Sequence, residues 1–458
     1  MRGLSLVRRM EHQRKGCIKP PQAPWGPRFF GAAAVVLASM LSPGRGAART
    51  WHVPGDAPTI QAGINLASAG DDVLVGPGTY LEHDIVMRAG VWVHSEGGPS
   101  VTTVDASAAG TGFICADLDQ TVTLEGFTIL NGRAQTAQRD GSGGGVRCIE
   151  SSLVIHDCVI TGCSAEDRGG AIYAYDATAE IEECKVYECL AALAGGGICA
   201  FESTAAITDC EVIDNWSIFG GGIMTHGPEA AISGCVVSGN GAYSGGGIFC
   251  QSLAFAIRNC VVTRNQAIVY GTGYGLVVVG TGSISGCTVA SNSGWGDDNA
   301  IYVVGDTEFD RTVVAFNEGV AFDCWEAQAG SRCCDVYGNA GGNEICGTDL
   351  GGNFSEDPLF CDAPNDDYTL NANSPCLPGN HPHGVDCGLI GARGWGCGTP
   401  PPTGACCFLD GSCVVAEQHD CEEQHGTYMG DSTTCDPNPC HPTPIRITTW
   451  GRIKAGFR

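Results

Sequence analysis

Three carboxylates recur along the chain at intervals of 26 residues: Asp157, Glu183 and Asp209. If successive repeats stack like neighbouring strands, adjacent carboxylates lie about 5 Å apart and alternate ones about 10 Å apart. Such separations suit the two carboxyl groups of a glycoside hydrolase, and they equally suit Ca²⁺, which takes several oxygen ligands. A solvated row of turns is the third interpretation, and it is favoured because the next two repeats carry Gly234 and Asn259 at this position.

Aromatic side chains form a second candidate site, because they recur once per repeat just before runs of glycine. Aromatic rings arranged in a stripe suit the faces of sugar rings, so these residues predict a ligand-binding surface for carbohydrate. The alternative is that the rings only pack loops against the wall of the domain. The candidates are Trp216, Phe219, Tyr243, Tyr270, Tyr274 and Trp295.

Both sets of side chains belong to one repeated pattern, Ile-x-x-Cys-x-(Val/Ile), which occurs six times between about residues 143 and 289. The cysteines are separated by 26, 26, 25, 25 and 27 residues, and a fixed period of this length indicates a repeat architecture. Each repeat combines short β-branched runs with glycines, which favours strands and turns over helices. The pattern predicts an all-β solenoid, a single-stranded parallel β-helix with about 25 residues, three short strands and three turns per coil. The cysteines are Cys158, Cys184, Cys210, Cys235, Cys260 and Cys287.

The spacing within the repeat places two corners of each coil. Isoleucine lies three residues before cysteine, so both side chains point inward only if the chain bends at the residue before each cysteine. Asn recurs five residues after the cysteine, and stacked Asn side chains can hydrogen-bond from coil to coil and tolerate a left-handed backbone. In an earlier coil, Gly126 is assigned to the cysteine position. The second position holds Cys163, Cys189, Asn215, Asn240, Asn265 and Asn292, and its register extends to Asn131, Asn317 and Asn339.

These repeats resemble those of bacterial right-handed parallel β-helix proteins, the pectate-lyase-like superfamily in the broad sense. The Gly-Gly-Ala-Ile and x-x-Asn units also resemble those of polymorphic outer-membrane proteins. The resemblance covers roughly residues 51–397 and implies a right-handed solenoid. It implies no single activity, because lyases, hydrolases, esterases, adhesins and inert stalks all use this fold.

Three short stretches resemble enzyme motifs of the superfamily only in part. Residues 78–82 look like the opening of pectinesterases, but nothing resembling their catalytic motifs follows. The Thr-His-Gly at 225–227 and the paired aspartates at 297–298 resemble polygalacturonase signatures in the wrong order. There is no arginine cluster of the pectate-lyase kind, and single histidines such as His156 and His226 are more often structural.

The chain divides into five predicted segments. Residues 1–48 combine a basic stretch, an apolar run and small residues, which is typical of a signal peptide. The β-helix domain spans 49–397 and begins with a short capping helix that places Ile60, Ile64 and Ala67 on one face. A Pro-rich linker (398–403), a Cys-rich module (404–440) and a basic tail (441–458) follow.

The 27 cysteines fall into two predicted classes. Stacked side chains lie about 4.8 Å apart, farther than disulfide Cβ atoms allow, so the six repeated cysteines are predicted to be buried thiols. Cysteines after Cys324 lie in loop-rich sequence and are expected to pair. The Cys-rich module is expected to form three disulfides, with zinc binding as the alternative. Its cysteines are Cys406, Cys407, Cys413, Cys421, Cys435 and Cys440.

Charge narrows the choice of partner. The whole chain carries a net charge of −26, and its first 48 residues hold eight Lys or Arg and one Glu, so the remainder carries −33. This charge argues against nucleic acid, and against a polyanionic glycan unless Ca²⁺ bridges the two. We expect a monomer without a transmembrane segment, secreted or displayed on a bacterial surface. It would bind, adhere or act as a spacer, with carbohydrate as the ligand; the alternative is a polysaccharide lyase or glycoside hydrolase with an atypical site.

Overall fold

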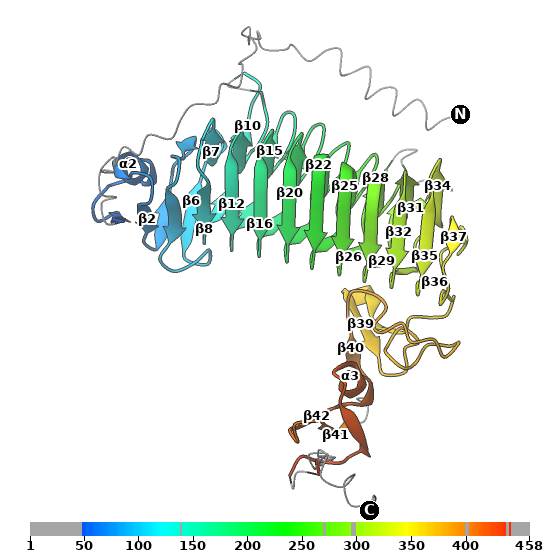
Figure 1. Ribbon diagram of the computed structural model, residues 1–458. Helices are drawn as coiled ribbons and strands as arrows, with labels where there is room; N and C mark the ends of the chain where they lie inside the picture. The colour runs from blue at the N-terminus through cyan, green and yellow to red at the C-terminus, as the bar shows by residue number, and fades with distance from the viewer. Residues whose placement is uncertain are drawn as a thin grey trace, which may run out of the picture. The chain divides into compact units, whose positions relative to one another are not determined.

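The computed structural model describes residues 48–137, 140–268, 272–294, 299–398, 403–436 and 439–440. The predicted signal peptide therefore lies outside the described residues except for its last position, and the basic tail lies wholly outside them. Most of the described chain winds into parallel coils stacked side by side (Figure 1). Ile155 pairs with Ile181, and Ile181 with Ile207, so residues one repeat apart lie on neighbouring strands. The predicted parallel β-helix is confirmed.

Four strand segments make up a regular coil, rather than the predicted three. In the coil that begins at Ile172, two segments belong to a 20-stranded sheet, one to an 11-stranded sheet, and one to a short three-stranded sheet. The extra segment arises because the first strand bends in the middle. In β22, β25 and β28 this bend disappears and the two segments merge into one long strand, whereas the later coils again have two segments, β31 with β32 and β34 with β35.

The strands are grouped here by sheet. The large sheet contains β1 (Thr50–Val53), β2 (Asp72–Val75), β4 (Ile85–Val86), β5 (Trp92–Ser95), β7 (Phe113–Ala116), β8 (Val122–Glu125), β11 (Val146–Ile149), β12 (Ser152–His156), β15 (Ile172–Tyr175), β16 (Thr178–Glu182), β19 (Ile198–Phe201), β20 (Thr204–Thr208), β22 (Ile223–Ser233), β25 (Ile248–Arg258), β28 (Leu276–Ser285), β31 (Asn299–Val304), β32 (Thr307–Asp310), β34 (Val320–Trp325), β35 (Ala329–Arg332) and β37 (Thr348–Asp349). The 11-stranded sheet contains β3 (Gly78–Tyr80), β6 (Thr102–Asp105), β9 (Thr128–Leu130), β13 (Val159–Thr161), β17 (Lys185–Tyr187), β21 (Glu211–Ile213), β23 (Val236–Ser238), β26 (Val261–Thr263), β29 (Thr288–Ala290), β33 (Val313–Ala315) and β36 (Asp335–Tyr337). The short sheets contain β10 (Arg133–Ala134), β14 (Ser164–Ala165) and β18 (Leu190–Ala191), and then β24 (Gly241–Ala242), β27 (Gln266–Ala267) and β30 (Ser293–Gly294).

The repeated cysteines line the interior as free, buried thiols, as predicted. Cys184 donates to the Ile155 carbonyl at 3.7 Å, and its hydrogen bonds with Cys158 and Cys210, together with burial, raise its pKa well above the ordinary value. The residue before each cysteine adopts the predicted bend in the left-handed region, with φ of 45° at Asp157 and 53° at Glu183. The six cysteines therefore act as small interior side chains.

The Asn position forms the predicted hydrogen-bonded ladder. Asn240 Nδ2 donates to Asn265 Oδ1 at 3.0 Å, and Asn265 Nδ2 donates to Asn292 Oδ1 at 3.0 Å. The ladder continues through Asn317 and Asn339. The left-handed residue is the one before each Asn, such as Arg264 with φ of 53°, and the Asn itself points into the buried interior.

Two assignments in the early coil were wrong by one residue. Phe127, and not Gly126, occupies the cysteine position, because β9 pairs with β13 at a spacing of 31 residues. Asn131 lies at the exposed left-handed corner, with φ of 57°, and donates to Asp105 instead of joining the ladder. Gly132 takes the interior position, where the backbone of Gly144 leaves no room for a side chain.

A short helix, α2 (Ile60–Leu66), lies against β1, β2 and β4 at the start of the solenoid, as predicted. The Thr59 hydroxyl caps it by accepting from the Ala62 N–H at 3.1 Å. Ile60 and Ile64 are fully buried in the main core. Among the described residues, no helix is long and apolar enough to cross a membrane.

A strap, defined as residues 357–398, follows the last coil and packs on the outer face of the 11-stranded sheet (Figure 1). It contains β38 (Phe360–Asp362), the 3₁₀ helix η1 (Ala363–Asn365), β39 (Asp367–Asn371) and β40 (Trp395–Cys397). Arg264 forms a 2.8 Å ion pair with Asp366, and the Ala392 N–H donates to Thr288 Oγ1 at 3.0 Å. Outward residues beneath the strap, such as Val261, are buried, whereas Lys185 on an uncovered coil is exposed.

Disulfides occur only at or after Cys324 among the described residues. Cys324–Cys346 lies within the last coils, Cys333–Cys387 joins a coil to the strap, and Cys361–Cys397 lies within the strap. The expectation that all later cysteines pair was wrong, because Cys334 and Cys376 are free and buried.

The Cys-rich module contains β41 (Thr403–Cys407), β42 (Cys413–Glu417), α3 (Gln418–Glu423) and β43 (Thr427–Asp431). Its three predicted disulfides are confirmed, which leaves no thiolate there for zinc. They are Cys406–Cys421, Cys407–Cys440 and Cys413–Cys435.

Candidate functional site

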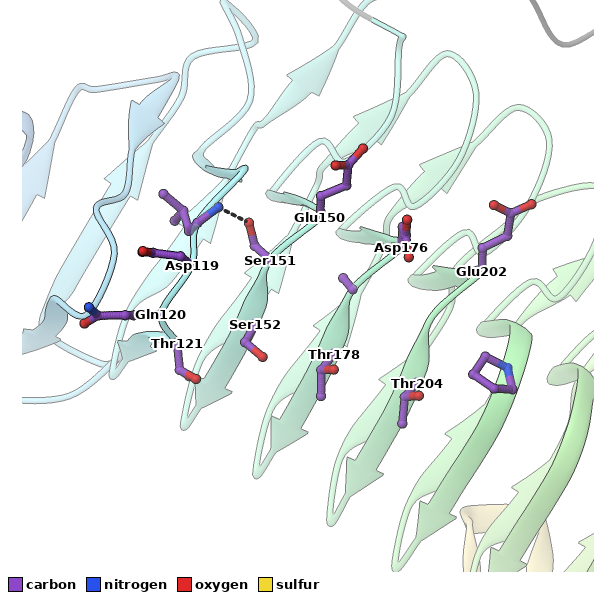
Figure 2. A pocket seen from close by; sticks show the side chains of 13 residues that line it. Asp119, Gln120, Thr121, Glu150, Ser151, Ser152, Asp176, Thr178, Glu202 and Thr204 are labelled. Atoms are coloured by element: carbon purple, nitrogen blue, oxygen red, sulfur yellow. Dashed lines mark hydrogen bonds between the residues drawn. The ribbon is translucent and has the colours of Figure 1, made fainter. Parts of the chain in front are cut away.

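A row of four carboxylates follows the bend within the large sheet. This acid row consists of Asp117, Glu150, Asp176 and Glu202, one from each of four successive coils. All four have left-handed backbones, with φ between 45° and 54°. The bend turns each strand away from its first segment, and the carboxylates of Glu150, Asp176 and Glu202 project from it side by side (Figure 2).

A row of hydroxyls runs parallel to the acid row, at the start of the second segment. This hydroxyl row consists of Thr121, Ser152, Thr178 and Thr204. The last three pair in register, and Thr121 directly precedes Val122, which pairs with Leu153. An open groove of about 680 Å³ follows the two rows across successive coils and is lined also by Asp119, Gln120 and Pro228 (Figure 2). Its lining includes no Lys, Arg or His, so the groove offers hydrogen-bond acceptors and hydroxyls without a cation.

A column of rings stands one residue before the acid row. This ring column consists of Tyr175, Phe201 and His226, with centroids 6.3 Å and 4.5 Å apart and ring planes within 15° of parallel. Because the rings stack on one another along the solenoid, the ring faces that lie between them are covered. Partial burial and the neighbouring Glu202, with which the Tyr175 hydroxyl is hydrogen-bonded, raise the pKa of Tyr175. The ring column therefore holds a carboxylate of the acid row in place.

Two arginines beside the ring column are each paired with an aspartate. Arg147 binds Asp140 through two contacts of 3.0 and 3.3 Å, and Arg168 binds Asp167 at 3.1 Å. The Arg168 guanidinium also lies 4.7 Å from the centroid of the Phe201 ring. Burial raises the pKa of Asp167, although the charge of Arg168 opposes this shift. The network fixes the wall of the ring column and leaves no unpaired arginine in it.

The carboxylates predicted from the sequence form a different row, at the corner between the large and the 11-stranded sheets. Asp157, Glu183 and Asp209 are all exposed. The next coil carries Gly234 at this position, where a Cβ would overlap the Asp209 carboxylate, so the row of carboxylates ends there. In the described part of the chain, none of them belongs to a cluster of three potential metal-ligand side chains. The single such cluster there is Cys407, Cys413 and Cys440, which are all in disulfides. Catalysis and Ca²⁺ binding at this corner stay predictions.

The predicted aromatic stripe is only partly available to a ligand. Trp216 and Tyr243 pack edge to face with centroids 6.0 Å apart, and Tyr243 is 42% exposed. Phe219 packs in the same way on Phe249 at 5.9 Å. Tyr274 is fully buried, so it is a packing residue and its assignment to a binding surface was wrong. Tyr270 and Trp295 lie outside the described residues.

The acid row and the ring column were missed although the sequence contains their signal. Glu150, Asp176 and Glu202 are spaced by 26 residues, and Phe201 lies 26 residues after Tyr175. These are the same spacings that identified the cysteine ladder. A search for every residue type that recurs with the period of the repeat would have found both.

Comparison with known proteins identifies the fold. Residues 139–293 match the family model described as right handed beta helix region. The chain is thus a right-handed parallel β-helix protein with a disulfide-bonded Cys-rich module. No curated protein matched the sequence.

Solved structures resemble the chain at low identity. Pectate lyase Pel9A has 14% identity and a TM-score of 0.43 over 77% of this chain and 98% of its own. A mannuronan C-5 epimerase A-module of Azotobacter vinelandii, from AlgE4, has 13% identity and a TM-score of 0.41 over 75% and 93%. The Streptococcus pneumoniae surface protein and adhesin PfbA has 10% identity and a TM-score of 0.29 over 65% and 95%. Likeness at this level carries no information about ligand or activity.

Proposed function

We propose that this chain is an exported, non-catalytic binding protein whose groove holds an uncharged, hydroxyl-rich polysaccharide. The observation that carries the proposal is the groove itself, which sets a row of carboxylates beside a row of hydroxyls on successive coils. Carboxylates accept strong hydrogen bonds from hydroxyl groups, and the hydroxyl row can both donate and accept. A polymer that runs along the solenoid meets the same pair of groups at each coil, about 4.8 Å apart.

Charge selects an uncharged ligand over an acidic one. The groove contributes Asp119, Glu150, Asp176 and Glu202 and no cation. Arg147 and Arg168, the nearby arginines, are already neutralised by their own aspartates. A polyuronate or a nucleic acid would therefore meet repulsion without a compensating positive group.

Binding is favoured over catalysis because the carboxylates of the acid row share one kind of environment. General acid–base catalysis needs two carboxyl groups whose surroundings differ enough to hold different protonation states. Glu150, Asp176 and Glu202 are all exposed, on the same kind of corner. Export is supported by six disulfides, since such bonds persist in oxidising compartments.

A polysaccharide-active enzyme is the second candidate, and one observation favours it. The partly buried Asp167, with its raised pKa, lies against Arg168 beside the ring column, and a perturbed carboxyl group next to a cation is typical of active sites. A screen for reducing ends and for the ultraviolet absorbance of unsaturated products, with and without Ca²⁺, separates the two candidates. Product release by wild type that is lost in Asp167→Asn would establish the enzyme.

The binding proposal is tested on a glycan array with purified full-length protein. Glu202→Gln keeps the shape of the side chain and removes its charge, so binding should fall by about tenfold to a hundredfold, the loss of one charge-assisted hydrogen bond. Glu188→Gln is the matched control, because Glu188 is an exposed, left-handed corner residue on a different edge of a neighbouring coil. Equal binding by both variants rejects the groove. A selective loss in Trp216→Ala or Tyr243→Ala moves the site to the aromatic stripe.

A further inference from the structure

The strap covers a carboxylate that has no cationic partner among the described residues. Asp335 begins β36 on the outer face of the 11-stranded sheet, where an acidic side chain would ordinarily be solvated, yet it is 0% exposed. Its Oδ2 accepts from the Cys376 thiol of the strap at 3.3 Å, and its Oδ1 accepts from the Glu356 N–H at 3.2 Å. The Asp335 carboxyl group therefore lies in the contact between the last coil and the strap.

The surroundings of Asp335 disfavour its ionised form. Cys376 belongs to an apolar cluster with Val313, Leu377 and Ile390 from the coil and the strap. The charged groups that act on Asp335 are Glu356 and Asp357, on the segment that enters the strap, and both are acidic. The other titratable neighbours are the buried thiols of Cys334 and Cys376. Burial raises the pKa of Asp335 from 3.8 to about 7, against the opposing effect of its two hydrogen bonds.

We propose that Asp335 and Cys376 form a pH-sensitive latch, which holds the strap on the sheet in acid and loosens its contact as the pH rises towards neutrality. The disulfide Cys333–Cys387 and the ion pair of Arg264 with Asp366 tether the strap on either side of the latch. Loosening is therefore local and reversible. It exposes the outer face of the coils that the strap covers without unwinding them.

The direction and range of the effect follow from linkage. A carboxyl group whose pKa is higher in the closed state than in the open state stabilises the closed state most below the open-state value. That stabilisation is lost as the pH rises to the closed-state value and changes no further above it. The pKa of Asp335 is 3.8 in the open state and about 7 in the closed state. Between these two pH values the equilibrium constant for opening rises about tenfold per pH unit. Between pH 4.5 and 7.5 the total increase is on the order of a hundredfold.

Hydrogen exchange followed by mass spectrometry on the full-length protein tests the latch. Exchange rates of peptides within residues 370–390 are measured from pH 4.5 to 7.5 for wild type and for Asp335→Asn, and their ratio at each pH cancels the intrinsic exchange rate. The latch predicts that this ratio, wild type over variant, rises on the order of a hundredfold across the range. A ratio that stays constant overturns it.

Two further measurements keep the test decisive if Asp335→Asn does not fold. Within wild type, strap peptides should lose protection relative to peptides from residues 172–213, which precede the coils seen in contact with the strap. Cys376→Ala removes the thiol but keeps the buried carboxyl group. Its strap should therefore be less protected against hydrogen exchange than that of wild type in acid, and should lose protection with rising pH in the same way. A strap whose protection follows that of residues 172–213 at every pH overturns the latch.

Discussion

Replacing Asn265 by alanine removes a complete set of hydrogen bonds from the interior of the solenoid. Asn265 Nδ2 donates to the Val237 carbonyl at 2.9 Å and to Asn292 Oδ1 at 3.0 Å. Its Oδ1 accepts from both the backbone N–H and the side chain of Asn240, each at 3.0 Å. The side chain is fully buried, so no solvent stands ready to replace these partners.

The loss of stability follows from these four contacts. A typical intramolecular hydrogen bond contributes about 0.5–1.5 kcal/mol, and a buried donor or acceptor left unpaired costs about 1–3 kcal/mol. The Asn240 N–H loses the acceptor that Asn265 provides, whereas the Asn240 side chain keeps its bond to the Val212 carbonyl. The net destabilisation should therefore be about 3–5 kcal/mol.

Equilibrium unfolding in urea, followed by circular dichroism, measures this loss. Asn131→Ala is the matched control, because Asn131 is exposed and makes one side-chain hydrogen bond, to Asp105. The control should change the free energy of unfolding by about 1 kcal/mol, because alanine tolerates the left-handed backbone at this position less well than asparagine does. The interior ladder would be refuted as a source of stability if the two variants unfolded at the same urea concentration.

Four further outcomes are expected. Gly221→Ala should prevent folding, because its Cβ would overlap two backbone carbonyls of the next coil, those of Gly241 and Gly246. Gly394→Ala should express as wild type, because a Cβ at Gly394 would meet no atom within 4 Å, and the soluble yields of the two variants are compared. Cys210→Ser should have a free energy of unfolding within about 1 kcal/mol of the wild-type value. Thr312 already places a hydroxyl at the equivalent interior position, where it donates to two carbonyls. Labelling of the unfolded, unreduced protein should modify the 14 solenoid and strap cysteines found as free thiols, and mass spectrometry showing these positions in disulfides would contradict the ladder. Reducing agent should make the chain from Cys324 onward sensitive to protease and leave the earlier coils intact, since their described residues contain no disulfide.

The sequence predicted the solenoid and its interior because the period is carried by buried side chains. Inward positions accept few residue types, so Ile181, Cys184 and Val186 recur with little change in each coil. The early coil was misplaced by one residue because its loop changes the spacing to 31, and Phe127 does not resemble a cysteine. The period of the regular coils therefore does not give the register of a coil that contains an insertion.

The packing of the strap on the outer face of the sheet and the acid row were not predicted, for two different physical reasons. The strap contacts its coils across about a hundred residues of sequence, as between Arg264 and Asp366, and no local pattern specifies such a contact. The strap leaves one trace in the sequence: outward positions of the covered strands hold apolar residues, such as Val261 and Ala290, where polar residues would be expected. The acid row lies on a bend within a strand, which the assumption of three strands per coil had excluded.

A structure of the protein with the glycan that binds best on the array tests the central claim most directly. The account predicts sugar hydroxyls within hydrogen-bond distance of at least two of the Glu150, Asp176 and Glu202 carboxylates, in a chain that runs along the groove. A sugar bound instead against Trp216 and Tyr243, with the groove empty, would contradict it.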